Sequence, residues 1–359
     1  MKVGILTFSA AHNFGAILQC YGLYKTICSL GHSVEVIDYR PDYLAASKPA
    51  FGWRQYLSRH FETLYARYSE YRYWRNIYDG YMAFKRKNMA MSAPVYDNTG
   101  LKTLVERYDI VVIGSDQIWN NRFNGRDMAW YGAISDRVRW ITYAASAGNV
   151  DDWAKWAAQQ TELLSHFENI SARESELADF VGTITGTQIP AVLDPSLLGN
   201  PDIWAQWRQP MIKEDYILTY QARESDDLFR IAENLKHQLG CKRIIPLDFY
   251  GNVKKMGHET FVASPGEFIS LIANARCVVT TSFHGTAFSI ILNTPFYTIR
   301  LNDGADGRSL NLLQATGLDN RMIECDDNPV FEPVNFADAC ERLSSLRKES
   351  LEFLRGSLS

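Results

Sequence analysis

Apolar and polar positions follow two different periods along the first forty residues of the chain. The run from Val3 to Thr7 is short and almost wholly apolar, as expected for a buried strand of a parallel sheet. Residues 13–30 carry apolar side chains at helical spacing, and Gly31 follows them, which predicts a helix that ends there. A second apolar run over 34–37 completes a β-α-β unit, the building block of a doubly wound sheet.

The same alternation continues to the end of the chain. Further strands are expected at 110–113, 140–143, 170–173, 216–219, 243–245, 277–280 and 296–299, the last of these closing the series. Helices are expected at about 152–167, 224–239, 266–274, 285–292 and 337–356. Two successive series of this kind predict an α/β protein of two Rossmann-like domains facing a cleft.

The expected domain organisation follows from these two series. Residues 1–188 form the first domain, with a helical insertion at about 41–107, and residues 189–336 form the second. A helix over 337–359 is expected to pack back onto the first domain. The length of 359 residues fits this division, because a single hydrophobic core rarely grows so large.

Composition excludes several classes of protein. Hydrophobic residues make up 46% and charged residues 22%, as in ordinary globular proteins, and the net charge of −4 argues against a nucleic-acid partner. No run of 18 apolar residues is present, and the chain enters a strand without the pattern of a cleavable leader. Six scattered cysteines without C-x-x-C spacing argue against a zinc site or disulfides. A cytoplasmic protein is therefore expected.

Residues 53–87 differ from the rest of the chain. They contain 11 aromatic residues and eight Arg or Lys against three acidic residues, and their pattern is helical and amphipathic. One interpretation is peripheral contact with the inner membrane surface or with a lipid-linked substrate, since basic and aromatic residues suit that interface. The other is a helical pair whose tyrosines pack on the first domain. The sequence leaves both open.

Open α/β sheets bind ligands at the carboxyl ends of their strands, so the loops that follow the strands are the places for function. The first such loop contains Asn13 and Gly15, with Gln19 one turn into the helix. The loop after 110–113 contains Asp116, Gln117, Trp119 and Asn120. A carboxylate, two amides and an indole suit a sugar, which has polar hydroxyls and an apolar face. The structural alternative is that Asp116 caps the next helix.

The most informative loop follows the strand at 277–280. It contains Thr281 and Ser282, and His284 stands at the start of an apolar helix. A helix N-terminus attracts anions, so His284 would be a titratable group beside a phosphate or carboxylate site. The alternative is that Ser282 only caps the helix and His284 only packs.

Two arginines are placed at further strand ends. Arg173 leaves the end of the strand expected at 170–173, and Arg308 follows the one at 296–299. Arginine binds phosphate and carboxylate bidentately, although a single arginine is most often a solvated surface residue.

Absent motifs narrow the chemistry. There is no G-x-G-x-x-G, so a Rossmann-type NAD enzyme is disfavoured. Walker A, H-E-x-x-H and D-x-D patterns are also absent. The absence of Walker A and D-x-D argues against a P-loop kinase and against a glycosyltransferase that uses a D-x-D metal site.

Seven collinear fragments together resemble the polysaccharide pyruvyl transferase family. They begin at residues 4–7 with 13–19 and continue through 36–41, 113–119 (I-G-S-D-Q-I-W), 143–146 (Y-A-A-S), 171–174 (S-A-R-E), 193–195 (L-D-P) and 281–286 (T-S-F-H-G-T). The resemblance implies a GT-B-like fold. It also implies transfer of the enolpyruvyl unit of phosphoenolpyruvate onto two hydroxyls of a sugar. The products are a pyruvate ketal, on a cell-surface polysaccharide or its lipid-linked precursor, and phosphate.

The resemblance implies roles for the strand-end residues. His284 and Asp116 are the expected catalytic residues. The second domain is expected on the donor side, and the donor-binding residues are Arg173, Ser282, Phe283, Gly285 and Arg308. The first domain is expected on the acceptor side, and the acceptor-binding residues are Asn13, Gln19, Gln117 and Trp119. No metal or cofactor is required, since phosphoenolpyruvate is itself a substrate.

One position departs from the family pattern. Some branches carry arginine two positions before the histidine, where this chain has Ser282, so the phosphate must be neutralised elsewhere, with Arg308 the first candidate. Two other functions stay open. One is a GT-B glycosyltransferase that uses a nucleotide sugar, and the other is a non-catalytic glycan-binding protein. The acceptor sugar and the oligomeric state do not follow from the sequence.

Overall fold

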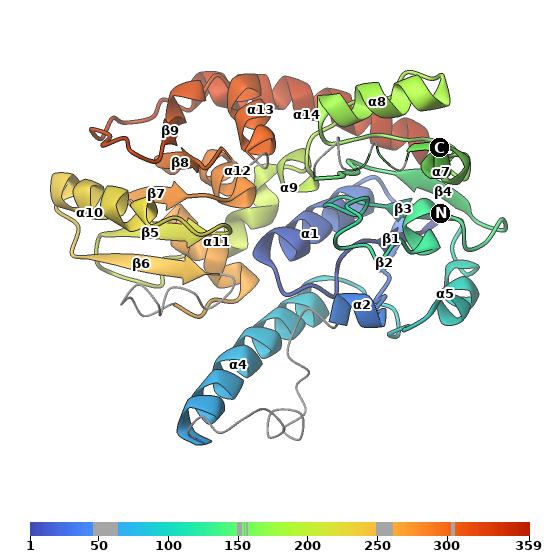
Figure 1. Cartoon of the computed structure of the whole chain (residues 1–359), viewed down its shortest axis with the longest axis horizontal. Helices are drawn as coiled ribbons and strands as arrows, with labels where there is room; N and C mark the ends of the chain where they lie inside the picture. The colour runs from blue at the N-terminus through green and yellow to red at the C-terminus, as the bar shows by residue number, and fades with distance from the viewer. Residues whose placement is uncertain (46–63, 149–152, 154, 156, 249–260, 303–305) are drawn as a thin grey trace. The chain divides into compact units, whose positions relative to one another are not determined.

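The computed structural model divides the chain into two compact units (Figure 1). It describes residues 1–45, 64–148, 153, 155, 157–248, 261–302 and 306–359. Unit 1 contains residues 1–198 and 350–359, and unit 2 contains residues 199–349. The boundary expected at 188/189 therefore lies inside unit 1. The cause is a short helix, α9 (Pro195–Leu198), which packs against α1 (Phe14–Ser29) of the same unit.

Unit 1 contains a four-stranded parallel sheet in the order β2-β1-β3-β4. The strands are β1 (Lys2–Leu6), β2 (Ser33–Val36), β3 (Ile110–Ile113) and β4 (Arg139–Thr142). Every residue of β3 is buried, as its continuous apolar sequence predicts. The strand expected at 170–173 is not formed, because Ala172 makes only isolated bridges to Ala145 and Ala191 before the chain turns into a helix.

Helical elements connect the strands of this sheet. Helix α1 begins after Asn13, whose side-chain Oδ1 accepts a hydrogen bond from Ala16 N at 3.3 Å, and it ends at Ser29, two residues before Gly31 at φ +88°. The remaining helical elements of unit 1 are α2 (Asp42–Ala45), α4 (Leu64–Asn88), α5 (Asn98–Val105), the 3-10 helix η1 (Met128–Tyr131), α7 (Ala157–Leu164) and α8 (Ser175–Thr185).

Helix α4 covers part of the aromatic and basic segment 53–87, of which residues 53–63 lie outside the described residues. In Figure 1 its C-terminal end meets the rest of unit 1 and its N-terminal end extends away from it. Near the C-terminal end, Tyr81 is buried and stacks on Phe14, and Lys85 Nζ donates to Ser9 O at 3.0 Å. For this half of the helix, the packing interpretation is therefore correct.

Unit 2 contains a five-stranded parallel sheet in the order β6-β5-β7-β8-β9. The strands are β5 (Tyr216–Gln221), β6 (Arg243–Asp248), β7 (Cys277–Thr280), β8 (Phe296–Arg300) and β9 (Met322–Glu324). The expectation that 296–299 is the last strand is wrong. Strand β9 is only three residues long, and only its central Ile323 is buried, so it has no recognisable apolar run.

The helical elements of unit 2 alternate with its strands. They are η2 (Pro201–Trp207), α10 (Asp227–Leu239), α11 (Pro265–Ala273), α12 (Phe283–Leu292), α13 (Gly307–Thr316) and η4 (Asp319–Arg321). The C-terminal helix α14 (Ala337–Ser357) begins in unit 2, and its last residues belong to unit 1. Both units are thus α/β layers built on parallel sheets, which confirms the predicted fold class.

The six cysteines form no disulfide, and three of them, Cys20, Cys241 and Cys277, are buried. Burial raises the pKa of the Cys20 thiol to about 12, as expected for an inert core cysteine. Among the described residues, no helix is both long enough and apolar enough to span a membrane.

The contact between α1 and α9 requires a glycine. A Cβ at Gly22 would lie 2.3 Å from Pro195 O, a backbone atom that cannot move aside alone. We expect Gly22→Ala to destabilise unit 1 by about 1–3 kcal/mol through overpacking. Thermal unfolding followed by circular dichroism measures this effect. The matched control is Gly356→Ala in α14, where a Cβ meets nothing within 4 Å, and an equal loss in both variants would contradict the packing argument.

Candidate functional site

The carboxyl edge of the unit 1 sheet brings three loops together. Asp116 follows β3, Ser146 follows β4, and Arg173 with Glu174 follows the bridge residue Ala172. Backbone hydrogen bonds join these loops, from Ser146 N to the carbonyl of Asp116 at 3.1 Å and from Arg173 N to the carbonyl of Ala145 at 2.9 Å. The chemistry-bearing residues of neighbouring loops therefore lie side by side.

Arg173 forms the charged centre of this edge. Its Nε lies 3.2 Å from Glu174 Oε1, and its Nη1 lies 2.8 Å from Asp194 Oδ2. The arginine side chain is only 4% exposed. Burial alone would lower the pKa of Arg173, but the nearby carboxylates of Glu174, Asp194 and Asp116 hold it above the ordinary value. Because Arg173 already balances buried carboxylates, this geometry argues against the predicted role in binding the anionic donor.

Glu174 is held from two sides but keeps one oxygen unused. Its Oε1 accepts hydrogen bonds from Ser146 Oγ at 2.7 Å and from Arg173 Nε at 3.2 Å. Its Oε2 is buried and, within the described part of the chain, has no hydrogen-bond partner. Glu174 also precedes α8 without capping it through its side chain. An unused buried carboxylate oxygen is costly, which marks this position as a candidate ligand contact.

Asp116 and Gln117 lie at the open side of the same edge. Asp116 has φ +75°, and its Oδ1 accepts a hydrogen bond from Gln117 N at 2.9 Å. No helix begins directly after it, so the helix-capping alternative is wrong. Gln117 Oε1 accepts from Asn120 Nδ2 at 2.6 Å, and a Cβ at Gly148 would lie 2.6 Å from either atom. Both amides are thus fixed in partly exposed positions, where a polar ligand can reach them.

The side chains of Gln19 and Asn13 serve the fold. Gln19 is fully buried, its Nε2 donates to Thr7 Oγ1 at 3.0 Å, and its Oε1 accepts from Ser115 N at 3.2 Å. It therefore does not reach a ligand, and its predicted acceptor contact is corrected to a support for the loop after β3. The Asn13 side chain is used as the cap of α1.

Trp119 also lies in the core instead of in an acceptor site. It has no exposed surface, and its indole Nε1 donates to Trp130 O at 3.0 Å. Its ring stacks on the rings of Tyr131 and Trp153, at centroid distances of 6.1 and 5.6 Å. The predicted sugar-stacking face is thus covered by other aromatic rings of unit 1.

In unit 2, the start of α12 is fixed to the end of β7. Ser282 N donates to Thr280 Oγ1 at 3.0 Å, and a Cβ at Gly285 would lie 2.3 Å from that same oxygen. The Ser282 side chain makes no capping hydrogen bond, so the interpretation of Ser282 as a simple cap is wrong. His284 stands in the first turn of α12 and is 8% exposed. The first-turn N–H groups of a helix have no acceptor within the helix, which favours an anion here.

Arg223 is a cation at this edge that the sequence analysis missed. It stands two residues after β5, and its Nη2 donates to the carbonyl of Thr281 at 3.2 Å and to Asp306 Oδ1 at 2.7 Å. Asp306 Oδ2 in turn accepts from Asn302 N at 2.7 Å, in the loop after β8. The guanidinium is therefore placed directly beside the start of α12. Its position just after a strand, like that of Arg173, is the sequence feature from which Arg223 could have been predicted as a site residue.

Two further residues belong to this edge of unit 2. Gln221, the last residue of β5, is 3% exposed, and its Oε1 has no hydrogen-bond partner in the part of the chain that the structure describes. Arg308 stands in the first turn of α13, two residues after Asp306. Three neighbouring strands, β5, β7 and β8, thus end in polar or cationic residues at one edge.

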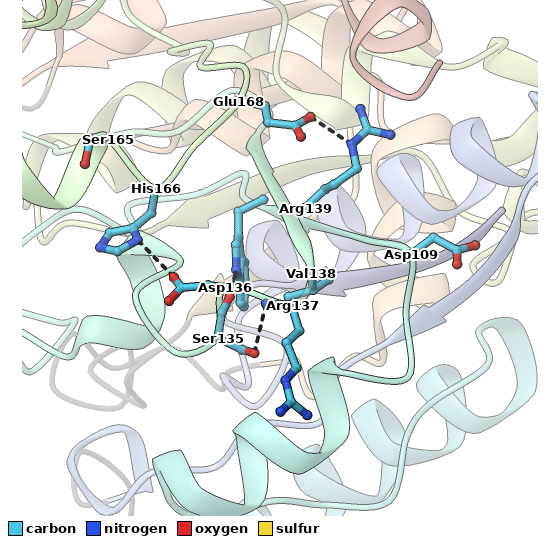
Figure 2. Close-up of a pocket in the computed structure, with 10 residues that line it drawn as sticks. Asp109, Ser135, Asp136, Arg137, Val138, Arg139, Ser165, His166 and Glu168 are labelled. Atoms are coloured by element: carbon cyan, nitrogen blue, oxygen red, sulfur yellow. Dashed lines mark hydrogen bonds and ion pairs between the residues drawn. The ribbon is translucent and has the colours of Figure 1, made fainter.

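A surface hollow of about 370 Å³ lies elsewhere in unit 1, near the amino end of β4 (Figure 2). In its lining, Arg139 Nε lies 2.8 Å from Glu168 Oε2, and His166 Nδ1 lies 3.9 Å from Asp136 Oδ1. It contains none of the predicted site residues and lies opposite the ligand-binding edge of a parallel sheet. Among the described residues, no group of three or more His, Cys, Asp or Glu is arranged to hold a metal ion.

The family model described as polysaccharide pyruvyl transferase matches residues 13–303, which include Asp116, Arg173 and His284 but not Arg308, and the chain belongs to this family. No curated protein is similar enough to count as a match.

Solved structures are similar to this chain at low sequence identity. UDP-GlcNAc 2-epimerase from Neisseria meningitidis bound to UDP-GlcNAc is similar at a TM-score of 0.50 and 10% identity, with 97% of this chain and 100% of that chain covered. The UDP-GlcNAc 2-epimerase from Methanocaldococcus jannaschii is similar at a TM-score of 0.48 and 12% identity, with 98% of this chain and 93% of that chain covered. ADP-heptose LPS heptosyltransferase II from E. coli is similar at a TM-score of 0.44 and 8% identity, with 97% of this chain and 99% of that chain covered. At these identities the likeness concerns the fold alone.

The buried ion pairs of Arg173 provide a test of this geometry. Arg173→Met leaves Asp194 and Glu174 buried without their cation, so we expect unit 1 to lose about 3–5 kcal/mol of stability. The matched control is Arg139→Met, whose partner Glu168 is 45% exposed, with an expected loss of about 0–1 kcal/mol. Thermal and urea unfolding of both variants measure the difference. Equal melting temperatures would show that the Arg173 pairs are not formed as described.

Proposed function

We propose that the protein transfers the enolpyruvyl group of phosphoenolpyruvate onto two hydroxyls of one sugar, with release of phosphate and formation of a pyruvate ketal. Membership of the polysaccharide pyruvyl transferase family supports a transferase that acts on a polysaccharide or its precursor. The observation that carries the choice of donor is the edge of unit 2, where Arg223 donates to the carbonyl of Thr281 beside the start of α12 and Arg308 stands in the first turn of α13.

The donor is expected at unit 2 for electrostatic reasons. Phosphoenolpyruvate has a phosphate and a carboxylate, which call for guanidinium groups and helix N-termini. Ser282 brings no charge to the place where some family branches have arginine. Arg223 offers an answer, because its guanidinium reaches the backbone carbonyl of Thr281, the residue directly before Ser282. In this proposal Arg223 and Arg308 together replace the missing arginine.

His284 is the proposed acid/base residue of the reaction, and in the first step it acts as the acid. It protonates the methylene carbon of the donor while the first sugar hydroxyl bonds to the adjacent carbon and loses its proton. The second hydroxyl then bonds to that same carbon and loses its proton as the phosphate leaves. Of the two hydroxyl protons, one is balanced by the new methyl group and the other by the released phosphate. In this scheme Asp116 and Gln117 orient the acceptor.

The first rival is a GT-B glycosyltransferase that uses a nucleotide sugar, and the second is a glycan-binding protein without activity. Neither is favoured by a specific feature of the described residues. Family membership favours pyruvyl transfer over both. The same purified protein can be titrated with phosphoenolpyruvate and with UDP-sugars, and stabilisation by UDP-sugars alone would select the first rival.

The reaction predicts that phosphate release from phosphoenolpyruvate depends on a sugar acceptor. We expect His284→Asn to lower this release by about 10²–10⁴-fold, as for loss of a general acid, with little change in melting temperature. Phosphate release and mass spectrometry of the sugar product are the measurements. Full activity of a folded His284→Asn protein would remove His284 from the mechanism.

The same experiment separates donor binding from chemistry. Arg223→Met should raise the KM for phosphoenolpyruvate at least about tenfold, the equivalent of about 1.4 kcal/mol for a lost charged hydrogen bond. Arg230→Met is the matched control. Arg230 lies on the neighbouring helix α10, its side chain is 43% exposed, and it forms an ion pair with Asp227. Identical kinetics of the two variants would contradict the donor assignment.

Peripheral contact with a membrane surface is a separate hypothesis, motivated by the exposed cations Arg72, Arg75, Arg86 and Lys87 of α4. It predicts weak binding to anionic vesicles that 0.5 M salt removes, because such attraction is screened within about 10 Å or less. Co-sedimentation with anionic and neutral vesicles is the measurement. Equal binding to both, or to neither, would reject the hypothesis.

A further inference from the structure

Glu174 has the geometry of a ligand-binding carboxylate, because one of its oxygens is held in place and the other is unused. Its residue is 9% exposed, and two donors, Ser146 Oγ and Arg173 Nε, hold Oε1 in place. Its Oε2 is buried with no partner among the described residues, although a buried carboxylate oxygen normally accepts a hydrogen bond. An oxygen that is fixed in direction and unused is what a hydroxyl of a bound molecule would satisfy.

The surroundings of Glu174 indicate which molecules can bind. Arg173 brings one positive charge, while Glu174, Asp194 and Asp116 bring three negative charges, so the formal charge of this group is −2. An anion would be repelled at this place, because like charges interact strongly where water is largely excluded. A neutral polyhydroxylated molecule has O–H donors and no charge, and it matches the unused acceptor.

We propose that Glu174 receives the acceptor sugar, accepting a hydrogen bond from a reacting hydroxyl at Oε2 and taking its proton, and that the acidic group selects neutral sugars over uronic acids. The inference rests on the proposed function, since it assigns a residue and a substrate class to the acceptor side of that reaction. It also gives Arg173 a different role from the one predicted from the sequence.

The atoms and electrons of this proton transfer balance without a further reactant. The O–H bond of the sugar breaks, its proton goes to Glu174 Oε2, and the oxygen forms a bond to the central carbon of the enolpyruvyl group. The electron pair of the carbon–carbon double bond takes a proton at the methylene carbon from His284. When the second hydroxyl bonds to the same carbon, its proton goes to the now neutral His284, and phosphate leaves with the electron pair of the broken carbon–oxygen bond. Glu174 then returns its proton to the released phosphate through the solvent.

Ser146 and Arg173 are positioning residues in this proposal. They act through Oε1, which leaves Oε2 as the reacting oxygen. Asp194 Oδ1 accepts from Ser196 N at 2.9 Å, so the second anchor of Arg173 is itself fixed. The rotation of the Glu174 carboxylate is therefore restricted from both sides, as an efficient general base requires.

The decisive variant is Glu174→Gln, which keeps the shape and the contacts of Oε1 but cannot take a proton. We expect phosphate release to fall at least about 100-fold, in the range for loss of a general base, while phosphoenolpyruvate binding changes less than about twofold. Glu176→Gln, an exposed position two residues later, is the matched control and should keep full activity. Ser146→Ala, which removes one positioning hydrogen bond, should reduce kcat by a smaller factor.

Sugar binding is measured independently of turnover. Saturation-transfer NMR with the methyl glycosides of glucose, galactose and mannose, and with methyl galacturonide, should show the neutral sugars binding to the wild-type protein and the uronide not. Glu174→Gln should weaken the neutral signals and reduce the discrimination, because the formal charge of the group falls from −2 to −1. Isothermal calorimetry with phosphoenolpyruvate is the parallel readout for the donor.

The outcomes separate the two proposals. If phosphoenolpyruvate is consumed and Glu174→Gln stays active, the role of Glu174 is overturned and the proposed function stands. If neutral sugars bind through Glu174 but phosphoenolpyruvate is never consumed, the proposed function and the proton-transfer role fail, while the acceptor site and its selection remain. If no neutral sugar binds to the wild-type protein, or if the uronide binds equally well, the inference is wrong.

Discussion

The common direction of the strands in each sheet is the constraint on which the rest of this structure depends. In a parallel sheet every strand ends at the same edge, so residues that follow different strands are brought together although they are far apart in the sequence. In unit 1 this places Asp116, Ser146 and Glu174 beside one another, and in unit 2 it places Arg223 beside the start of α12. The polar groups at each edge follow from that topology.

The two edges differ in charge, and this difference organises the proposed chemistry. At the edge of unit 1, three carboxylates surround one guanidinium, and hydrogen bonds hold each partner of Arg173 in place. At the edge of unit 2, Asp306 pairs with Arg223, Arg308 adds a second guanidinium, and the N-terminus of α12 favours an anion. The two proposals accordingly assign a neutral acceptor to the first unit and an anionic donor to the second, for a chain that belongs to the pyruvyl transferase family.

Single positions show where reasoning from the sequence reached its limit. The loops of the site could be predicted because strand ends are visible as apolar runs followed by polar residues. The orientation of Trp119 and Gln19 could not, since a polar or amphipathic side chain in a loop can turn outward or into the core. Arg173 was placed at the right edge, but only its partner Asp194, 21 residues later in the chain, revealed that its charge is already balanced.

The sequence by itself determined the two α/β series, the strand-end loops and the family, because hydrophobic periodicity and collinear fragments are local properties of the chain. Tertiary structure decided which side chains line an edge and which support it, where unit 1 ends, and that Arg223 and Glu174 lie at the two strand-end edges. Those outcomes depend on contacts between residues distant in sequence, such as Gly22 with Pro195 and Ser146 with Glu174, and no local pattern contains them.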